Sequence, residues 1–513
     1  MFDLIKFPEL YFGLVAPVGV NLEKTATELS SSLQDRGYTV HILKVTDLYD
    51  AISGIGTKLY KSPLLDRYKS YISFGNEFRE KSDDPGVLAA LTVAWISQHR
   101  ERYRRDGSAK HKEKEAYILH QFKRKEEIDI LRQTYGRLFF QISTYSSRRK
   151  RAEYLANRFA EDAGTSDFSQ FLSDAEELIQ LDEAQTKLEF GQRVREVFHH
   201  ADFIINRDDE SDERTQINRF VDLIFGRNDI SPTRLEYGMY MAKGAALRSL
   251  DLSRQVGAAI FTKEGEIVTL GCNEVPKGLG GTYWAGDKFD ARDFRRGEDP
   301  NERIKRNNAL ELLERLNSKY LKKTSDELRE IVDSEIVSES RIMDALEFGR
   351  IIHAEMSAIT DASRLGRATA GSVLFCTTFP CHMCAKHIIS SGISTVYFLE
   401  PYPKSHAYDL HSDSLKVEGS FTAEHESYPK TEFIHFSGVS PRRYRDLFER
   451  GKRKSGGKFK NWLDSPERPM FSMKLPMWCT LEDFLVMRLR RDFGLSSTLR
   501  KLRSKPFSST SRR

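Results

Sequence analysis

Two short motifs concentrate the residues of this chain that could do chemistry. Residues 353–355 read HAE, and residues 380–384 read PCHMC. One imidazole and two thiolates are suitable ligands for tetrahedral Zn²⁺, and a set of three protein ligands leaves the fourth position open, as in catalytic zinc sites. We therefore predict that His353, Cys381 and Cys384 hold a catalytic zinc ion.

The carboxylate of the first motif suggests what such a centre would do. Glu355 lies two residues after the predicted ligand, in a stretch with a helical pattern. Zinc acidifies a water molecule, which can then attack an electron-poor ring carbon. Glu355 can take a proton from that water and pass it to a ring nitrogen, so that an amine leaves as ammonia. We therefore predict Glu355 as the catalytic acid–base.

Other readings of the cysteine pair are a redox pair or half of a zinc finger. A redox pair needs no HAE partner, and a finger needs two further ligands at close spacing. His382 or His387 could supply one of these ligands. Pro380 before the first cysteine and the surrounding strand–helix pattern favour the catalytic reading.

The two motifs together resemble the H-x-E…P-C-x-x-C signature of zinc-dependent nucleobase deaminases. Residues 251–276 also resemble the entry segment of deoxycytidylate deaminases, in which a strand pair ends in Gly-Tyr-Asn-Gly. Residues 271–274 here read GCNE, so the resemblance implies Asn273 as a contact of the deoxyribose. Many of those enzymes carry a second, structural zinc, but no Cys or His lies between Asn273 and His353.

Three further side chains suit the phosphate of a nucleotide. Residues 396–405 look like the segment that follows the last active-site helix in the same family. By their chemistry, the candidates for phosphate contacts are Arg254, Lys404 and Ser405.

Strand and helix patterns predict the domain that positions these residues. Strands are expected at 255–262, 266–271, 372–377 and 395–399. A helix with Ser231 as its N-cap and Pro232 in its first turn should run to about residue 249, which puts a domain boundary near 228–232. The resemblance implies a five-stranded, three-layer α/β/α cytidine-deaminase-like domain over residues 229–440, with a charged helical insertion at about 301–350.

The first 228 residues alternate strand and helix patterns. The expected strands are 11–16, 38–45, 116–119, 138–142 and 201–205, and the first helix is 22–33. This alternation predicts an α/β domain with an open, mainly parallel sheet. Its strand–glycine–helix opening resembles the phosphate loop of P-loop nucleoside and nucleotide kinases, whose loop reads G-x-x-x-x-G-K-[ST].

The loop departs from that pattern. Gly13 and Gly19 are present, but valine and Asn21 replace the lysine and the hydroxyl residue, and Lys24 and Thr25 follow one helical turn too late. These five residues are therefore candidates for a degenerate nucleotide site. Without the loop lysine we expect regulation by a nucleoside triphosphate rather than phosphoryl transfer.

Composition sets the remaining bounds. The 513 residues are 39% hydrophobic and 30% charged, with no long apolar run, which predicts a globular protein without a membrane span. Five cysteines do not form a disulfide framework, and the compartment expected from them and from the N-terminal sequence is the cytoplasm. Residues 441–513 hold 20 Lys/Arg against 7 Asp/Glu, so this C-terminal extension could attract nucleic acid.

The whole arrangement resembles the bacterial anti-phage dCTP deaminases. That resemblance implies zinc-dependent conversion of dCTP and dCMP to deoxyuridine nucleotides, depletion of dCTP during infection, and self-association into a homo-oligomer. Two alternatives stay open. One is a cytosine deaminase of single-stranded nucleic acid, which the basic extension favours. The other is a nucleotide-sensing protein whose zinc is structural.

Overall fold

The structure, a computed structural model, divides into two compact units. It describes residues 4–102, 111–184, 191–208, 212–402, 404–418, 428–462, 468–471, 473–505 and 508–510. Unit 1 comprises Met1–Glu236 and Phe436–Arg513, and unit 2 comprises Tyr237–His435. Within the described segments, no helix combines the length and the apolar character that a bilayer crossing requires.

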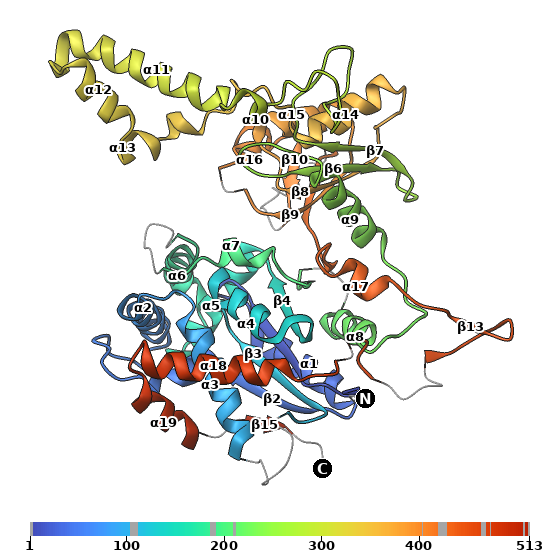
Figure 1. The fold of residues 1–513 in the computed structure, drawn as a ribbon. Helices are drawn as coiled ribbons and strands as arrows, with labels where there is room; N and C mark the ends of the chain where they lie inside the picture. The colour runs from blue at the N-terminus through green and yellow to red at the C-terminus, as the bar shows by residue number, and fades with distance from the viewer. Residues whose placement is uncertain are drawn as a thin grey trace. The chain divides into compact units, whose positions relative to one another are not determined.

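Unit 1 is built on a seven-stranded sheet in the order β12-β5-β4-β1-β3-β2-β15 (Figure 1). The central five strands are mutually parallel, and both edge strands are antiparallel to their neighbours. The five are β1 (Leu10–Val15), β2 (Thr39–Lys44), β3 (Glu115–His120), β4 (Phe139–Tyr145) and β5 (Phe203–Asn206). All five strands expected from the sequence are therefore present, in the predicted parallel arrangement.

Helices connect these strands, as a parallel sheet requires. They are α1 (Leu22–Gln34), α2 (Leu64–Ser82), α3 (Val87–Arg102), α4 (Lys125–Tyr135), α5 (Arg148–Asp162), α6 (Leu172–Ala184), α7 (Val194–Phe198) and α8 (Glu213–Ile224). Fully buried residues of β1 and β4, such as Phe12 and Phe140, stack within the core. The sheet therefore carries the hydrophobic core of the unit.

The C-terminal segment is an integral part of unit 1, which corrects the sequence-based description of 441–513 as a separate extension. It contributes β12 (Gly438–Val439), α17 (Tyr444–Phe448), α18 (Met477–Arg491), α19 (Ser496–Ser504) and β15 (Ser508–Thr510). Strands β12 and β15 extend the sheet at its two edges. Arg443, one of the basic residues of this segment, is buried and donates to Asp202 and to the carbonyl of Phe139. Part of the positive charge is thus used inside the fold.

A buried charge network joins this segment to the first strand. Arg100 of α3 donates from Nε to Glu9 Oε1 at 2.7 Å and from Nη1 to Glu482 Oε2 of α18 at 2.5 Å. Trp478 of α18 and Tyr11 of β1 both donate to Glu9 Oε2. Because Arg100, Glu9 and Glu482 are all buried, each charge depends on the others for compensation.

Unit 2 is built on a six-stranded sheet in the order β10-β11-β9-β8-β6-β7. Its strands are β6 (Gly257–Phe261), β7 (Ile267–Cys272), β8 (Val373–Thr378), β9 (Thr395–Glu400), β10 (Leu415–Val417) and β11 (Thr431–His435). The four strands expected from the sequence are present, and β10 makes the sheet one strand larger than the five predicted.

Helices cover both faces of this sheet. The principal ones are α9 (Arg234–Ala246), α14 (Ala354–Arg364), α15 (His382–Ser390) and α16 (Ala407–His411). Successive residues of a strand point to opposite faces. Ile260 and Leu374 pack in the cluster that contains Ala358 of α14, whereas the ring of Phe375 lies against Gly238 of α9. The predicted three-layer α/β/α architecture is therefore observed.

Helix α9 begins two residues later than the sequence suggested. Its cap is Thr233 rather than Ser231: Glu236 N donates to Thr233 Oγ1, and Thr233 N donates to Glu236 Oε2. This reciprocal pair is a capping box, which satisfies two otherwise unpaired amides. Glu236 also accepts two hydrogen bonds from Arg219.

The insertion between β7 and α14 is helical, as predicted. It contains α10 (Asp293–Arg296), α11 (Pro300–Leu316), α12 (Ser325–Val332) and α13 (Glu335–Ser338), and Figure 1 shows α11 and α12 side by side. Lys305 of α11 donates to the carbonyl of Met343, and Asn301 donates to that of Ala345. The insertion is thereby tied to the segment that leads back to the sheet.

We predict that replacing Arg100 with methionine destabilises unit 1 by about 3–5 kcal/mol, because two buried carboxylates lose their shared cation. The free energy of unfolding measured in urea checks this. Arg491→Met, which changes an exposed arginine of α18, is the matched control and should shift it by less than about 0.5 kcal/mol. Equal effects of the two substitutions would contradict an integral role for the C-terminal segment.

Candidate metal centre and active site

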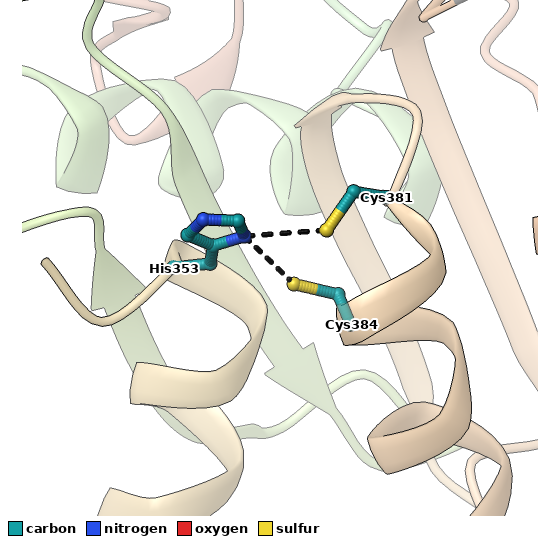
Figure 2. A group of neighbouring side chains, drawn as sticks. All are labelled: His353, Cys381 and Cys384. Atoms are coloured by element: carbon teal, nitrogen blue, oxygen red, sulfur yellow. Dashed lines mark hydrogen bonds between the residues drawn. The ribbon is translucent and has the colours of Figure 1, made fainter. Parts of the chain in front are cut away.

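Three ligand atoms converge in unit 2. Cys381 Sγ and Cys384 Sγ each lie 3.3 Å from His353 Nδ1, and one ligand atom of each residue lies within 4.8 Å of the others (Figure 2). Both cysteines are buried and His353 is half-buried. The three residues predicted as ligands from the sequence are therefore brought together.

The convergence arises because two helices begin at the same place. His353 is the N-cap of α14 and Cys381 is the N-cap of α15, and Figure 2 shows both side chains at these helix starts. Gly271 of β7 allows the approach: a Cβ there would lie 2.2 Å from the carbonyl oxygen of Ala354. Helix α14 can therefore pack directly on β7, which fixes the position of His353.

The donor set fits zinc. The pKa of the Cys381 thiol is lowered to about 4, first because the Cys384 thiol donates a hydrogen bond to it and then because the His353 ring stabilises its thiolate. The hydrogen bond with Cys381 also raises the pKa of His353. A preformed thiolate beside an imidazole and a second thiol is the combination that zinc prefers. The two sulfurs and Nδ1 would hold the metal.

Glu355 lies beside this group. It is buried, and Cys384 Sγ lies 3.5 Å from its Oε2. Burial raises the pKa of its carboxyl, the direction expected for a carboxylate removed from water. Cys376 of β8 forms a side-chain hydrogen bond with it, a contact that sequence spacing gave no reason to expect. Glu355 is thus held at the predicted ligand group.

Asn273 is buried and its amide is engaged within the protein. Its Oδ1 accepts from Val256 N at 2.7 Å, and its Nδ2 donates to Asp251 Oδ2 and to the carbonyl of Arg254. Asn273 therefore fixes the loop that precedes β6. The deoxyribose contact expected from the sequence stays a prediction.

Asp251 is a residue of this site that sequence reasoning missed. It is near enough to His353 for their charges to interact, and burial raises its pKa. Asp251 lies about a hundred residues before the HAE motif, so no local pattern links the two. The antiparallel pairing of β6 with β7 brings the loop that contains Asp251 to Asn273.

The candidate phosphate contacts lie on segments that flank the metal centre. Arg254 is exposed, lies over the ring of Tyr402 and donates to Glu400 at 3.2 Å. Lys404 is exposed and pairs with Asp344 of the insertion at 2.5 Å. Both cations are therefore balanced by carboxylates that a phosphate group would have to displace.

Ser405 has a bracing position. Its Oγ donates to the carbonyl of Pro380 at 2.8 Å and accepts from Ala407 N. It thereby links α16 to the residue that precedes Cys381. Its role as a phosphate contact stays a prediction.

The unit 1 loop differs from the sequence-based expectation at Gly13. This residue lies within β1, and a Cβ there would be 2.7 Å from the ring of Phe139. Gly13 is therefore required for packing and does not belong to the loop. Gly19 does belong to it: its φ is +90°, and a Cβ there would lie 2.9 Å from the carbonyl oxygen of Arg151.

The other three loop candidates open α1. Asn21 is its N-cap and accepts from Lys24 N. Thr25 donates to the buried carboxylate of Glu213, and Lys24 lies 3.9 Å from the same carboxylate. Lys24 and Thr25 are thus bound to α8, whereas Gly19 and Asn21 line a cavity of unit 1.

Comparison with known proteins gives the same site a family context. Residues 232–400 match the family model described as the cytidine and deoxycytidylate deaminase zinc-binding region. This segment contains all three ligand residues. Zinc is accordingly the metal of this domain, and the group of one histidine and two cysteines is the one that could bind it.

Individual relatives cover parts of the chain. ComE operon protein 2 of Bacillus subtilis (strain 168) is 49% identical over 59 residues, 12% of this chain and 31% of that protein, so the chain spans about a third of its length. A probable deoxycytidylate deaminase of Drosophila melanogaster is 26% identical over 202 residues, 39% of this chain and 76% of that protein. The apo crystal structure of dCMP deaminase from cyanophage S-TIM5 aligns over 40% of this chain and 99% of that chain at 17% identity, with a TM-score of 0.22.

We predict that Cys384→Ala weakens zinc affinity by more than the roughly 10- to 100-fold loss typical of an outer-shell partner, because a direct ligand is removed. Competition with a chromophoric chelator measures the affinity, and elemental analysis measures zinc content. Cys272→Ala, another buried cysteine of the same unit, is the control and should retain zinc. Unchanged zinc affinity in the Cys384 variant would refute the assignment.

Proposed function

We propose that this protein catalyses the zinc-dependent hydrolytic deamination of deoxycytidine nucleotides to deoxyuridine nucleotides. The observation that carries the proposal is the buried carboxylate of Glu355 beside the convergent His353, Cys381 and Cys384. A purely structural zinc site needs no adjacent acid–base group, whereas a hydrolytic site does. Zinc would supply an acidified water as the nucleophile.

The residues of the chain have distinct parts in this reaction. Glu355 accepts a proton from the attacking water and delivers it to the ring nitrogen N3. A bond forms between the water oxygen and C4. Glu355 then takes the second proton from that oxygen and passes it to the amine, the C4–amine bond breaks, and the amine leaves as ammonia. Asn273 holds the loop 251–256 in place and Ser405 braces the turn before Cys381.

For the substrate, we propose dCTP and dCMP. Arg254 and Lys404 are the exposed cations on segments that flank the metal centre, and Tyr402 offers a ring beside Arg254. Guanidinium and ammonium groups suit phosphate oxygens. Two such groups could serve a polyphosphate better than a single phosphate, because each meets a separate charge.

The wider proposal follows the resemblance to anti-phage dCTP deaminases. The enzyme would act in the cytoplasm, as a homo-oligomer, and would deplete dCTP when a phage replicates. Unit 1, with its P-loop-like opening, would sense a nucleotide and control the deaminase. A cytosine deaminase of single strands, bound through basic C-terminal residues, remains the alternative, and a cytosine oligonucleotide offered in place of dCTP would reveal it through ammonia release.

We predict that Glu355→Gln lowers kcat by about 10²- to 10⁴-fold, since the general acid–base is lost while the shape of the side chain is kept. Ammonia release from dCTP and from dCMP measures the rate. Zinc content should be unchanged, because Glu355 is not one of the predicted ligands. Glu347→Gln, an exposed neighbour in sequence, is the control. Full ammonia release by the Glu355 variant would contradict the assignment of Glu355 as the general acid–base.

We predict that Lys404→Ala raises KM for dCTP on the order of tenfold and raises KM for dCMP less, because a charge-assisted contact to the outer phosphates is lost. Steady-state kinetics with both substrates measure this. Lys386→Ala, which removes an exposed lysine on α15, should leave both KM values unchanged. Equal effects of Lys404→Ala on the two substrates would remove Lys404 from triphosphate recognition.

A further inference from the structure

Unit 1 contains a cavity of about 210 Å³ that the deamination proposal does not use. It lies where β1, β2 and β3 end, since its walls include residues that follow each of these strands within two positions, namely Pro17, Val45 and Gln121. Helix α1 and helices α2, α3, α5 and α6 contribute the remaining walls.

The position of the cavity in the sheet favours a ligand. The chain passes from β1 to β2, which lies on one side of β1, and later to β4 on the other side. This reversal is a topological switch point, and open parallel sheets bind ligands at the carboxyl ends of their strands near such points.

Tyrosine rings supply much of the wall. Tyr68 and Tyr71 of α2 and Tyr154 of α5 are half-buried along the cavity, and Tyr49 is buried beside them. Tyr49 stacks on Phe74, which fixes its ring. Aromatic faces of this kind bind planar bases by stacking.

The loop itself is not available for a polyphosphate. Val18 N donates to Asp182 Oδ2 at 2.7 Å, so a carboxylate of α6 occupies an amide that could have bound phosphate. Lys123 binds Asp182 Oδ1 at 2.9 Å and the carbonyl of Ala16 at 3.0 Å. The groups at the loop that could bind phosphate are therefore already paired with Asp182.

Two arginines of the cavity wall are not neutralised. Within the described part of the chain, neither Arg67 nor Arg158 forms an ion pair. Arg67 lies over the ring of Tyr71 at 4.8 Å, and Arg158 donates to Tyr154 Oη at 3.1 Å. Both guanidinium groups thus lie beside the tyrosines without a carboxylate in direct contact among the described residues, and guanidinium is well suited to bidentate phosphate binding.

His120 supplies an unsatisfied polar atom in the same wall. Its Nε2 is buried and has no hydrogen-bond partner among the described residues. Burial lowers the pKa of His120 to about 4, so the ring is neutral and can exchange a hydrogen bond with an uncharged polar edge. A buried polar atom without a partner is rare in a folded protein, and a ligand would satisfy it.

We propose that this cavity binds a nucleoside 5′-monophosphate, with the base between the tyrosines, its polar edge at His120, and the phosphate at Arg67 and Arg158. A cavity of about 210 Å³ is below the usual range of roughly 300–1,000 Å³ for small-molecule sites, which favours a compact ligand. The ligand proposed for unit 1 is therefore a nucleoside monophosphate, in place of the nucleoside triphosphate that the sequence suggested. Binding is independent of the deaminase; an effect of binding on turnover would rest on the function proposed above.

The test is calorimetric titration of the full chain carrying Glu355→Gln, so that no nucleotide is turned over, with dUMP, dAMP, the matching nucleosides and dCTP as probes. We expect at least one monophosphate to bind, with its nucleoside weaker by about 10- to 100-fold. Arg158→Ala should weaken the monophosphate by a similar factor. Arg149→Ala, an exposed arginine of the same helix paired with Glu153, should not.

Further variants separate this site from the deaminase site. Arg158→Lys keeps the charge and should restore part of the affinity, which excludes simple misfolding as the cause of the loss. Binding of the monophosphate should persist when Cys384→Ala removes zinc. Ammonia release is measured separately, on the chain without substitutions, so that the deamination proposal and the binding proposal can fail independently. The proposal is overturned if binding disappears with Cys384→Ala, if dCTP binds more tightly than the monophosphates at this site, or if no probe binds in a way that depends on Arg158.

Discussion

The catalytic proposal depends on one packing constraint, the direct approach of α14 to β7. Gly271 presents no Cβ to the first turn of α14, so His353 is held at the start of that helix where Cys381 and Cys384 arrive from α15. A larger residue would meet the backbone of Ala354, and the helix would have to move away. A displacement of about 1 Å is enough to spoil a preorganised site. The chemistry of the three ligands is thus inseparable from close helix–sheet packing.

Local patterns were sufficient to predict the central strands of unit 1, four strands of unit 2 and the convergence of the ligand group, because these features depend on short motifs and on hydrophobic periodicity. The three-layer architecture of unit 2 was implied by the family resemblance. The parts that could not be predicted depend on tertiary contacts. Asp251 approaches His353 through strand pairing, and Cys376 meets Glu355 because β8 runs beneath α14. The cap of α9 is an exception, because Thr233 and Glu236 form a local T-x-x-E capping box that sequence reasoning missed; Glu236 also binds Arg219 of α8.

Charge was the least reliable guide in the sequence. A basic C-terminal composition suggested an independent extension, but composition does not reveal burial. Arg443 compensates Asp202 in the interior, and α18 supplies Glu482 to the buried Arg100. The same limitation applies to Gly13, which spacing placed in a phosphate loop although it makes room for Phe139 within a strand. In each case the decisive partner comes from a distant element, and no window of sequence contains both.

The cations of the two proposed nucleotide sites differ in how they are balanced, and this difference has a thermodynamic consequence. In unit 2, Arg254 and Lys404 are paired with Glu400 and Asp344, so an incoming phosphate must replace an existing attraction. In unit 1, Arg67 and Arg158 form no ion pair with any described residue, so a phosphate there gains its attraction without breaking one. Net binding energy is the new interaction less the one displaced. At a given nucleotide concentration, the unit 1 cavity would therefore be more fully occupied than a site of equal geometry in unit 2. A sensing site requires this, because it must be occupied before the site that it controls.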